Sequence, residues 1–408
     1  MLPTDEILEA LDLSRAEPGL GFLQALFARF IARVPFETAS KILRQAEVDD
    51  SKARPRRPEI FWKEHLERGT GGTCFARVAA FAALLEELGF APRKVLGSVE
   101  RDFDHAALLV PQAERLWICD VGFPLPALLP AREGRVETTL TDLAVLPTTR
   151  GFRVELFAGV PEGPRTLEIF DAPVSEEQFR ERWSASFHPG SKFLSNVALR
   201  RQEATRILSF SHGEVRVDDR HSRLTVPIPA PRDEPLAGLF DIDRDLLARA
   251  LALTGDPGPT RSDSRLAAYL QTPASREAAF AAIGHPEAYR KLLEGIGRVT
   301  LEESTQASWR FRLAAPNEQE AVGEGGHLSE EVVPGPQQFT LRVRRRSADA
   351  SSTMDSEFRV EERSGHTYLI REALLGPSGA DLLRNDSLRG RLAGALAVDL
   401  LAWARRIP

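Results

Sequence analysis

The sequence predicts an α+β protein built from more than one domain. Its 408 residues exceed the roughly 100–200 residues of an ordinary single domain. Over residues 5–90, apolar residues recur every three or four positions, as in "LGFLQALFARFIARV", which indicates helices. From Arg93 to about Val226, short runs such as "FRVELFAG" alternate apolar and polar residues, which indicates strands. We therefore expect a helical bundle over residues 1–92 and a β-rich domain over 93–226.

The remaining sequence predicts a closing helical segment and a further α+β domain. "LFDIDRDLLARALALT" has helical spacing, so residues 227–258 should close the preceding region, and "GDPGPTRSDSR" after it is rich in boundary residues. Residues 263–408 should begin with a strand at "RLAAYLQTP", continue with short helices and several strands over 297–372, and end in a long amphipathic helix. The apolar residues that share one face of that last helix are Leu388, Leu392, Leu396, Leu400 and Trp403.

The composition excludes several classes of function. Apolar residues make up 42% and charged residues 27%, the balance of a folded globular protein. A formal charge of −6 gives no general attraction to nucleic acid or anionic lipid. The N-terminus "MLPTDEILEALDL" lacks the basic start of a secretory signal, and no 18-residue apolar run occurs. We expect a cytoplasmic protein with neither a nucleic-acid nor a membrane partner.

The two cysteines are candidates for chemistry rather than for cross-linking. Cys74 and Cys119 cannot build a disulfide framework, and neither has the spacing of a zinc site, so no metal is expected. Cys74 follows three glycines in "RGTGGTCFARV" (68–78) and precedes apolar residues at helical spacing. The first turn of a helix favours a thiolate, and glycines allow close approach of backbone or substrate. Cys74 therefore suits a nucleophile, with a buried packing cysteine as the alternative.

A histidine and an aspartate on the following strands could activate this thiol. In "DHAALLV" and "RLWICDV", a four-residue loop "PQAE" would pair Val110 with Arg115 and place His105 opposite Asp120 on one face. Directly opposed residues have Cβ atoms about 4.5–5.5 Å apart, which allows a carboxylate–imidazole hydrogen bond. His105 could then take the proton of Cys74. Alone, each residue has a structural alternative, a satisfied histidine or a capping acid, and Cys119 should only pack.

At these residues the sequence resembles the arylamine N-acetyltransferase family. That family carries an "R-GG-Y-C-F-E-N" segment at its nucleophile, a histidine on a strand and a "DVGFG" segment with the aspartate. The counterparts here are "RGTGGTCFARV", "DHAALLV" and "ICDVGFP", and Val34–Glu37 is similar to the family's upstream "PFEN" element. The similarity spans roughly residues 5–252, including "SKFLSNVALRRQEATRILSF" at 191–210.

The resemblance implies a helical bundle, a β-barrel-like domain and an α/β part, within the cysteine-proteinase and transglutaminase-like class of core. It implies ping-pong transfer, in which Cys74 takes an acyl group from acetyl-CoA or a related thioester and yields it to an amine, with His105 and Asp120 completing the triad. The residues that it suggests for substrate binding are Phe36, Phe75, Phe123, Gly72 and Thr73, and those near CoA are Gly122 and Pro124.

Several positions depart from the family pattern. Thr73 replaces the usual tyrosine, Ala76 and Arg77 replace the residues after Cys-Phe, and Thr38 stands in place of asparagine. Pro124 replaces the glycine of "DVGFG". Because proline has no N–H donor and a restricted backbone, the ordinary binding of CoA is not assured here.

Residues 263–408 lie beyond that family's usual length. Their order of elements and the segment "HPEAYRKLLEGIGRV" resemble the START and polyketide-cyclase-like helix-grip (SRPBCC) superfamily. This resemblance implies an antiparallel sheet around the closing helix and a cavity for an apolar ligand.

The sequence leaves three functions open. The first is an acyltransferase with a small-molecule amine as acceptor. The second is a thiol hydrolase, a transglutaminase-like enzyme or an amide-forming enzyme of natural-product metabolism, since the same triad serves all of these. The third is a catalytically inactive ligand-binding protein, suggested by the altered residues beside Cys74 and after Phe123.

Overall fold

The protein consists of two compact units. The computed structural model describes residues 2–123, 125–158, 165–255, 258–259, 262–294, 298–305, 308–314, 327–335, 339–347, 353–363, 365–376, 382–383, 385–404 and 407. The first unit holds Met1–Ala158, Pro164–Arg216 and Ile228–Thr260, and the second holds Val217–Pro227 and Arg261–Pro408. Among the described residues, no helix combines the length and the hydrophobicity needed to cross a membrane.

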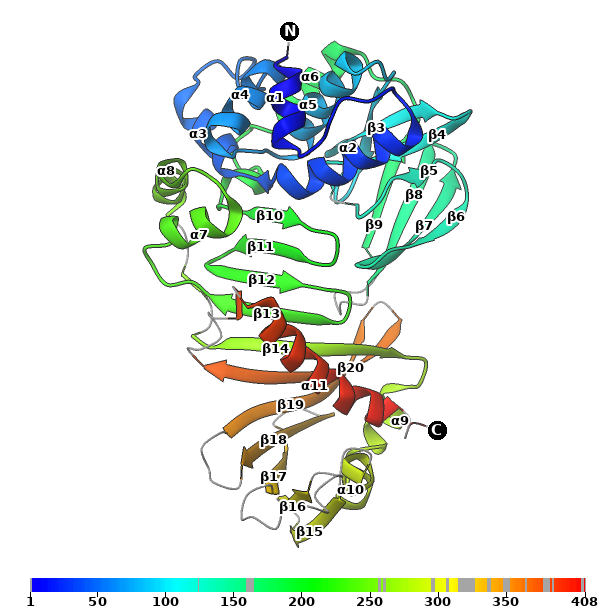
Figure 1. Ribbon diagram of the computed structural model, residues 1–408, viewed down its shortest axis with the longest axis vertical. Helices are drawn as coiled ribbons and strands as arrows, with labels where there is room; N and C mark the ends of the chain where they lie inside the picture. Colours follow the sequence, from blue (N-terminus) through cyan, green and yellow to red (C-terminus); the bar gives the residue numbers. More distant parts are fainter. Residues whose placement is uncertain are drawn as a thin grey trace. The chain divides into compact units, whose positions relative to one another are not determined.

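Five helices begin the first unit (Figure 1), as the helical spacing predicts. They are α1 (Thr4–Ala10), α2 (Leu20–Arg33), α3 (Ala39–Glu47), α4 (Pro58–Arg68) and α5 (Cys74–Glu87). In α5 nearly every residue from Cys74 to Leu85 is buried, because "CFARVAAFAALL" offers apolar side chains all round the helix. This central helix therefore fixes the position of its first residue, Cys74, within the core.

An eight-stranded antiparallel sheet packs against α5 through β3 (Figure 1). Its order is β5-β4-β3-β2-β9-β8-β7-β6. The strands are β2 (Arg93–Ser98), β3 (His105–Gln112), β4 (Arg115–Cys119), β5 (Leu129–Pro130), β6 (Gly134–Glu137), β7 (Thr141–Thr148), β8 (Gly151–Ala158) and β9 (Arg165–Phe170). The inner faces of β3 and β4 join α1, α2, α4 and α5 in one hydrophobic core.

The β3–β4 hairpin corrects the predicted register. Val110 pairs with Trp117 rather than with Arg115, and Leu109 pairs with Ile118. The chain turns through Ala113 and Glu114 alone, both at positive φ (52° and 59°), as a two-residue type I′ turn requires. A shift of two residues keeps every side chain on its predicted face. His105 and Asp120 therefore still lie on the same face of the hairpin, as predicted.

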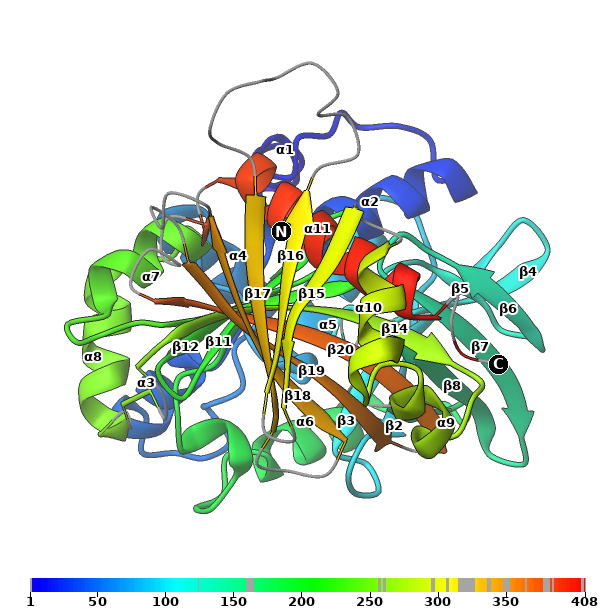
Figure 2. The ribbon, with the colours of Figure 1, turned by 90° about the horizontal axis from the view of Figure 1, so that it is seen from below.

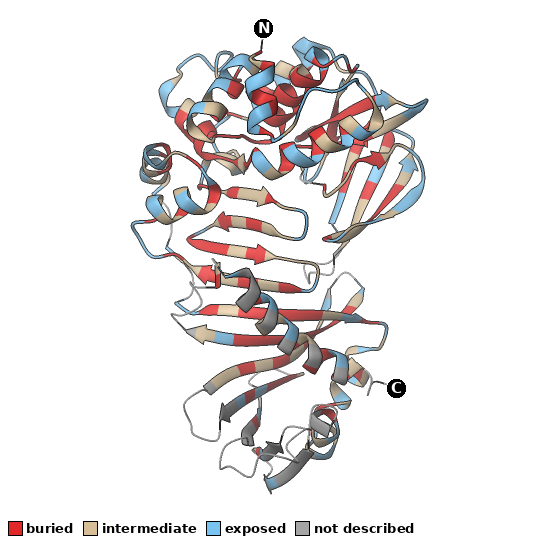
Figure 3. Ribbon diagram, viewed as in Figure 1, coloured by how far each residue is buried: buried red, intermediate tan, exposed pale blue. Residues whose placement is uncertain are grey.

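The first unit also contains elements that the sequence pattern missed. The short strand β1 (Phe36–Glu37) lies between α2 and α3 and starts a run of neighbouring strands in the order β1-β10-β11-β12. Its other strands are β10 (Leu199–Gln202), β11 (Ile207–Ser211) and β12 (Glu214–Asp218), and buried residues alternate with half-buried ones along β11 (Figure 3). The helix α6 (Glu176–Ala185) and the 3-10 turn η1 (Lys192–Leu194) interrupt the region predicted as strand.

The closing segment of the first unit is two helices rather than one. α7 (Asp233–Phe240) and α8 (Arg244–Thr254) are separated at Asp241, which adopts a left-handed conformation at φ 57°. Asp243 then caps α8 by accepting the N–H of Leu246 at 2.8 Å.

The second unit is an antiparallel sheet with a long closing helix (Figures 1 and 2). The strand order is β13-β14-β20-β19-β18-β17-β16-β15, and α11 (Asp386–Ala404) packs on β14 and β20. The strands are β13 (Ser222–Pro227), β14 (Ser264–Thr272), β15 (Arg298–Ser304), β16 (Trp309–Ala314), β17 (His327–Pro334), β18 (Thr340–Ser347), β19 (Thr353–Arg363) and β20 (His366–Gly376). The short helices are α9 (Arg276–Ala281) and α10 (Pro286–Glu294).

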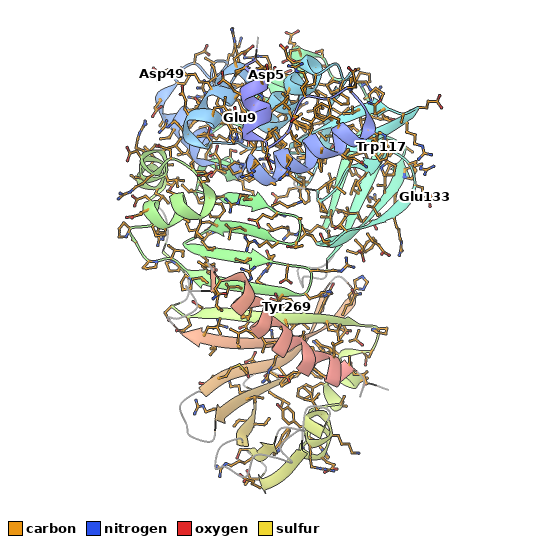
Figure 4. The ribbon with its side chains drawn as sticks, viewed as in Figure 1. Asp5, Glu9, Asp49, Trp117, Glu133 and Tyr269 are labelled. Atoms are coloured by element: carbon orange, nitrogen blue, oxygen red, sulfur yellow. The ribbon has the colours of Figure 1, made fainter. Side chains whose placement is uncertain are left out.

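This order confirms the predicted sequence of elements after residue 263. Leu396, Leu400 and Trp403 are buried on α11, and Trp403 Nε1 donates to the carbonyl of Ala279 at 2.8 Å. Tyr269 on β14, labelled in Figure 4, is also buried. Residues 315–326, which fall within the predicted run of strands at 297–372, lie outside the described residues.

Candidate active site

Cys74 is the first residue of α5 and is 7% exposed. Thr73 before it has extended backbone angles (φ −80°, ψ 177°) and makes no capping side-chain hydrogen bond among the described residues. The N–H groups of the first helical turn therefore lack a side-chain cap and favour negative charge at this end. The Sγ atom lies 3.9 Å from the carbonyl oxygen of Asp104, the residue before His105.

The segment around Phe36 runs beside the glycines that precede Cys74. Glu37 N–H donates to the carbonyl of Gly72 at 3.3 Å, and Gly72 N–H donates to the carbonyl of Pro35 at 3.4 Å. A Cβ at Gly71 would lie 1.7 Å from the backbone carbonyl oxygen of Pro35, so only glycine fits this close approach. The sequence elements "VPFE" and "GGTC" therefore meet in space although they lie far apart in the chain.

His105 and Asp120 form a buried hydrogen-bonded pair. Nε2 of His105 lies 2.7 Å from Oδ2 of Asp120, and the two side chains are 4% and 0% exposed. The other carboxylate oxygen, Oδ1, accepts the backbone N–H groups of Gly122 at 2.9 Å and Phe123 at 2.8 Å. With both oxygens engaged, Asp120 fixes the orientation of the imidazole and leaves its Nδ1 for Cys74.

The charges around His105 favour its protonated form. Burial lowers the pKa of His105, but the charge and hydrogen bond of Asp120, together with a hydrogen bond and charge from Cys74, raise it to about 10. An imidazolium that keeps its proton at neutral pH stabilises a thiolate beside it. The arrangement can therefore hold Cys74 and His105 as an ion pair.

Asp104 and Arg77 support this site, and sequence reasoning assigned neither a role. The carboxylate of Asp104 accepts the N–H groups of Val99, Glu100 and Arg101 at 2.8–3.0 Å, which fixes the loop leading into His105. The available signal was an aspartate that closes the polar segment "SVERDFDH" directly before a strand.

Arg77 joins three segments of the site from within α5. It is 1% exposed; its Nε donates to the carbonyl of Val121 at 2.6 Å, and its terminal nitrogen donates to that of Val34. Burial lowers the pKa of Arg77 to about 9, with the charges of Asp120 and Glu37 opposing that shift. The available signal was an arginine inside an otherwise apolar helix, three residues after Cys74.

Lys41 is a second buried cation that the sequence pattern did not single out. It lies on α3, is 5% exposed, and its Nζ donates to Ser186 Oγ at 3.0 Å. Burial lowers the pKa of Lys41 to about 8, while the charge of Cys74 opposes that shift. Lys41 follows closely on Phe36–Glu37, a segment whose backbone runs beside Gly72, just before Cys74.

The other predicted site residues divide into two groups. Phe123 is half-buried and its ring lies edge-on to His105 with centroids 6.3 Å apart, while half-buried Phe36 contacts Phe193 at 5.5 Å. Thr73 and Phe75 are buried at 3% and 2% exposure, and Phe75 packs on Phe179 in the core. Substrate contact at these positions stays a prediction.

The remaining predictions concern Cys119, Gly122 and Pro124. Cys119 is fully buried, and burial followed by the charge of Asp120 raises its pKa well above the usual range, as suits a packing residue. The N–H of Gly122 is engaged by Asp120. Pro124 lies outside the described residues.

Comparison with known proteins places this geometry in a family. A family model described as N-acetyltransferase matches residues 19–225, a range that contains Cys74, His105 and Asp120. The chain belongs to the arylamine N-acetyltransferase family. The predicted resemblance is thereby confirmed for this part of the chain.

Individual arylamine N-acetyltransferases are distant relatives. The chain is 26% identical to the enzyme of Mycolicibacterium smegmatis over 201 residues, which are 45% of this chain and 70% of that protein. It is 33% identical to the enzyme of Escherichia coli (strain K12) over 109 residues, 25% of this chain and 36% of that protein. A solved structure of the Mycobacterium marinum enzyme in complex with CoA gives a TM-score of 0.54 at 18% identity, covering 62% of this chain and 99% of that one. The fold with a barrel-like sheet and helices is thus shared over about 62% of the chain.

The second unit has a separate surface recess of about 610 Å³. Charged residues that already pair with each other line much of it, such as Arg344 with Asp355 at 2.7 Å and Arg265 with Glu372 at 2.6 Å. This lining differs from the apolar cavity that the sequence predicts, so the apolar ligand stays a prediction.

Proposed function

We propose that this chain transfers an acetyl or other acyl group from a CoA-type thioester to a small-molecule amine, such as an arylamine or hydrazine, through a thioester on Cys74. The observation that carries the proposal is the contact of His105 with Asp120 beside a thiol at the start of α5. Membership of the arylamine N-acetyltransferase family supports the same chemistry.

The proposed reaction has two half-reactions. In the first, the thiolate of Cys74 attacks the thioester carbonyl, the bond to the CoA sulfur breaks, and the leaving thiolate takes the proton of His105. In the second, the amine attacks the Cys74 thioester, gives its proton to Nδ1 of His105, and the amide leaves as the thiolate forms again. Uncapped N–H groups at the start of α5 are suited to stabilise the tetrahedral oxyanion in both steps.

Acetyl-CoA is the natural first donor to test, because the Mycobacterium marinum relative was solved with CoA. The N–H groups of Gly122 and Phe123 already bind Asp120, so they are not available to a phosphate. We infer that this loop contributes little to the binding affinity for CoA. Acetyl-CoA and its truncated analogue acetyl-N-acetylcysteamine should therefore acylate Cys74 at more similar rates than in enzymes that use loop amides for the pyrophosphate.

The decisive experiment measures CoA release with a thiol-detecting dye, with and without an amine, and the acyl adduct by intact mass. Amine-dependent release supports the transferase, while amine-independent release supports the thiol hydrolase. Cys74→Ser should lose the adduct, whereas the matched variant Cys119→Ala should keep it because Cys119 is fully buried. Absence of both adduct and release in the unmodified protein, across a panel of acyl thioesters, would favour an inactive ligand-binding protein.

For the second unit we propose a helix-grip domain that binds an apolar molecule. Its support is the strand order β14-β20-β19-β18-β17-β16-β15 with the closing helix α11 packed on β14 and β20. Titration of the full chain with a fluorescent fatty acid tests it. Saturable binding that Leu396→Arg removes is expected, and binding that Leu401→Arg removes equally would contradict an interior site, since Leu401 is 48% exposed.

A further inference from the structure

Lys41 is a buried ammonium whose surroundings lack a matching carboxylate among the described residues. Its side chain ends on a hydroxyl, Ser186 Oγ, which itself donates to the carbonyl of Trp183 at 2.7 Å. The ion pairs within the described part of the chain include none at Lys41. A buried charge without an ionic partner destabilises the folded protein even after the site relaxes. A position retained at such a cost calls for a role.

Two aromatic rings lie close to the ammonium of Lys41. Nζ lies 4.9 Å from the ring centre of Phe187 and 5.9 Å from that of Phe193, within the range of cation–π contacts. Phe193 in turn contacts Phe36, with centroids 5.5 Å apart, and Phe36 lies beside the glycines that precede Cys74. Phe193 and Phe36 are half-buried, so a flat ligand has partly open rings to pack against near Lys41.

The proposed reaction changes the charge that Lys41 experiences. In the free enzyme, the charge of Cys74 raises the pKa of Lys41 against the effect of burial. When Cys74 carries an acyl group, its sulfur is neutral and this attraction is lost. The charge of Lys41 is incompletely compensated in both states, because its pKa falls to about 8 even beside Cys74, and an anion on the incoming acceptor would compensate it.

We propose that Lys41 selects acceptor amines that carry an anionic group, such as an aromatic amine with a carboxylate, by pairing its ammonium with that group. This inference rests on the proposed acyl transfer and names the substrate class of the same site. The ring of the acceptor packs on Phe36 and Phe193, and its carboxylate replaces Ser186 as the partner of Nζ. Lys41 is thus a specificity-determining residue.

The test compares two amines that differ in this one charge, 4-aminobenzoate and its neutral analogue 4-aminobenzamide. The readout is the ratio of their kcat/KM values with one acyl donor, in the unmodified protein and in Lys41→Met. Intrinsic nucleophilicity cancels between the two proteins. We expect the preference for the carboxylate to be at least about 10-fold greater in the unmodified protein, since 1.4 kcal/mol corresponds to a factor of ten.

Three further variants sharpen the comparison. Lys41→Arg keeps the charge and should keep most of the preference, and Lys41→Gln should lose it, which covers the case that the methionine variant does not fold. Lys63→Met is the matched control, because Lys63 is 71% exposed on α4, and its preference should equal that of the unmodified protein. Equal ratios in the unmodified protein and Lys41→Met, or an equal loss of rate with both amines, would overturn the proposal.

A second readout separates this proposal from the proposed function. Protection of Cys74 from iodoacetamide, followed by intact mass, requires binding but no acyl transfer. We expect 4-aminobenzoate to protect the unmodified protein at a concentration at least about 10-fold below that of 4-aminobenzamide, and Lys41→Met to show no such difference. If no thioester acylates the protein while this difference persists, the acyl transfer fails and the anion selectivity stands. Equal protection by both amines overturns the selectivity even in an active transferase.

Discussion

Gly122 lies directly against Cys74. A Cβ built at Gly122 would stand 2.7 Å from the Cβ of Cys74, 3.0 Å from its Cα and 2.9 Å from the carbonyl oxygen of Ala106. These neighbours are the start of a packed helix and the backbone of a strand, so neither can move away from an added methyl group without a loss of stability. The glycine of "CDVGF" is therefore required for the contact between the nucleophile's helix and the loop that carries Asp120.

Gly122→Ala should strongly reduce acylation of Cys74. The added methyl group forces the loop and the start of α5 apart, and overpacking of this kind costs about 1–3 kcal/mol of unfolding free energy. A shift of the sulfur relative to His105 should lower the acylation rate by about 100-fold. Stopped-flow CoA release and thermal melting measure the two effects.

Gly134→Ala is the matched control for this substitution. Gly134 lies in β6, where no atom of the described residues lies within 4 Å of an added methyl group, so both rate and stability should stay near those of the unmodified protein. Full acylation activity in Gly122→Ala would show that the loop moves freely relative to α5, against the close packing of Gly122 on Cys74.

The raised pKa of His105 predicts an unusual pH dependence of Cys74 alkylation. Because this pKa lies near 10, His105 stays protonated through neutral pH, and a cation beside a thiol favours the thiolate form. Alkylation by iodoacetamide should therefore vary little between pH 6.5 and pH 9, about 2-fold or less, whereas an unpaired thiol gains reactivity steadily as it ionises around pH 8.5.

Asp120→Asn should restore the steep dependence. The amide removes the charge and the charge-assisted hydrogen bond that raise the pKa of His105, so the imidazolium is lost at lower pH and burial dominates. We expect alkylation at pH 6.5 to fall by about 10-fold or more relative to the unmodified protein. A flat profile in both proteins would mean that Asp120 does not control the charge of His105.

Arg77 should act as a positioning residue for the same site. Arg77→Met leaves the buried carbonyls of Val34 and Val121 without this donor and removes a cation near Asp120. The expected loss of unfolding free energy is about 3–5 kcal/mol, and Arg77→Lys, which keeps the charge but not the fork of donors, should lose less. Arg29→Met, at a side chain 45% exposed on α2, should stay within about 0.5 kcal/mol.

A readout other than stability is needed to show positioning. In Arg77→Lys the alkylation of Cys74 at pH 6.5 should fall, because Val121 neighbours Asp120 and its displacement weakens the His105 contact. If Arg77→Lys is destabilised while its alkylation profile is unchanged, Arg77 has a role in folding alone.

The pairing of His105 with Asp120 could be predicted because it depends only on which face of a strand each residue occupies. The turn itself could not, since Ala113 and Glu114 carry no Asn-Gly or Asp-Gly signal for a two-residue hairpin. The resulting error of two residues left the faces unchanged, whereas an error of one would have separated His105 from Asp120.

The sequence contains a helix-start signal for α6 that the predicted strands over 93–226 left out. Ser175 and Gln178 form a capping box, in which Gln178 N–H donates to Ser175 Oγ at 3.1 Å and Ser175 N–H donates to Gln178 Oε1 at 3.0 Å. The segment "SEEQ" states this pattern in the sequence. The capping box was missed because the segments on either side have the alternating pattern of strands.

The buried cations could not be predicted from local pattern. Arg77 finds its carbonyl partners 43 and 44 residues away, and Lys41 contacts Ser186, 145 residues away. Such burial is a property of the packed tertiary structure, and a lysine or arginine on a helix is ordinarily solvated. Only the fold shows that these two face the nucleophile's surroundings.

The buried charge of Lys41 should lower the stability of the folded protein while it provides the selectivity for the acceptor. Burial lowers the pKa of Lys41 to about 8 from 10.5, so between these values the unfolded chain binds more protons at this residue than the folded one. The cost of the buried charge is therefore fully present below pH 8 and is relieved as the pH rises toward 10.5. Lys41→Met removes that cost and should raise the unfolding free energy by about 1–3 kcal/mol at pH 6.5.

The sign of this effect can be checked by melting both proteins at pH 6.5 and pH 9.5. The advantage of Lys41→Met should shrink at the higher pH, where Lys41 of the unmodified protein folds largely uncharged. His105 has the opposite slope, since its pKa is raised, but it is present in both proteins and cancels in the difference. A lower melting temperature for Lys41→Met at pH 6.5 would mean that the ammonium is compensated in the free enzyme, and the gain in acceptor selectivity would then carry no cost in stability.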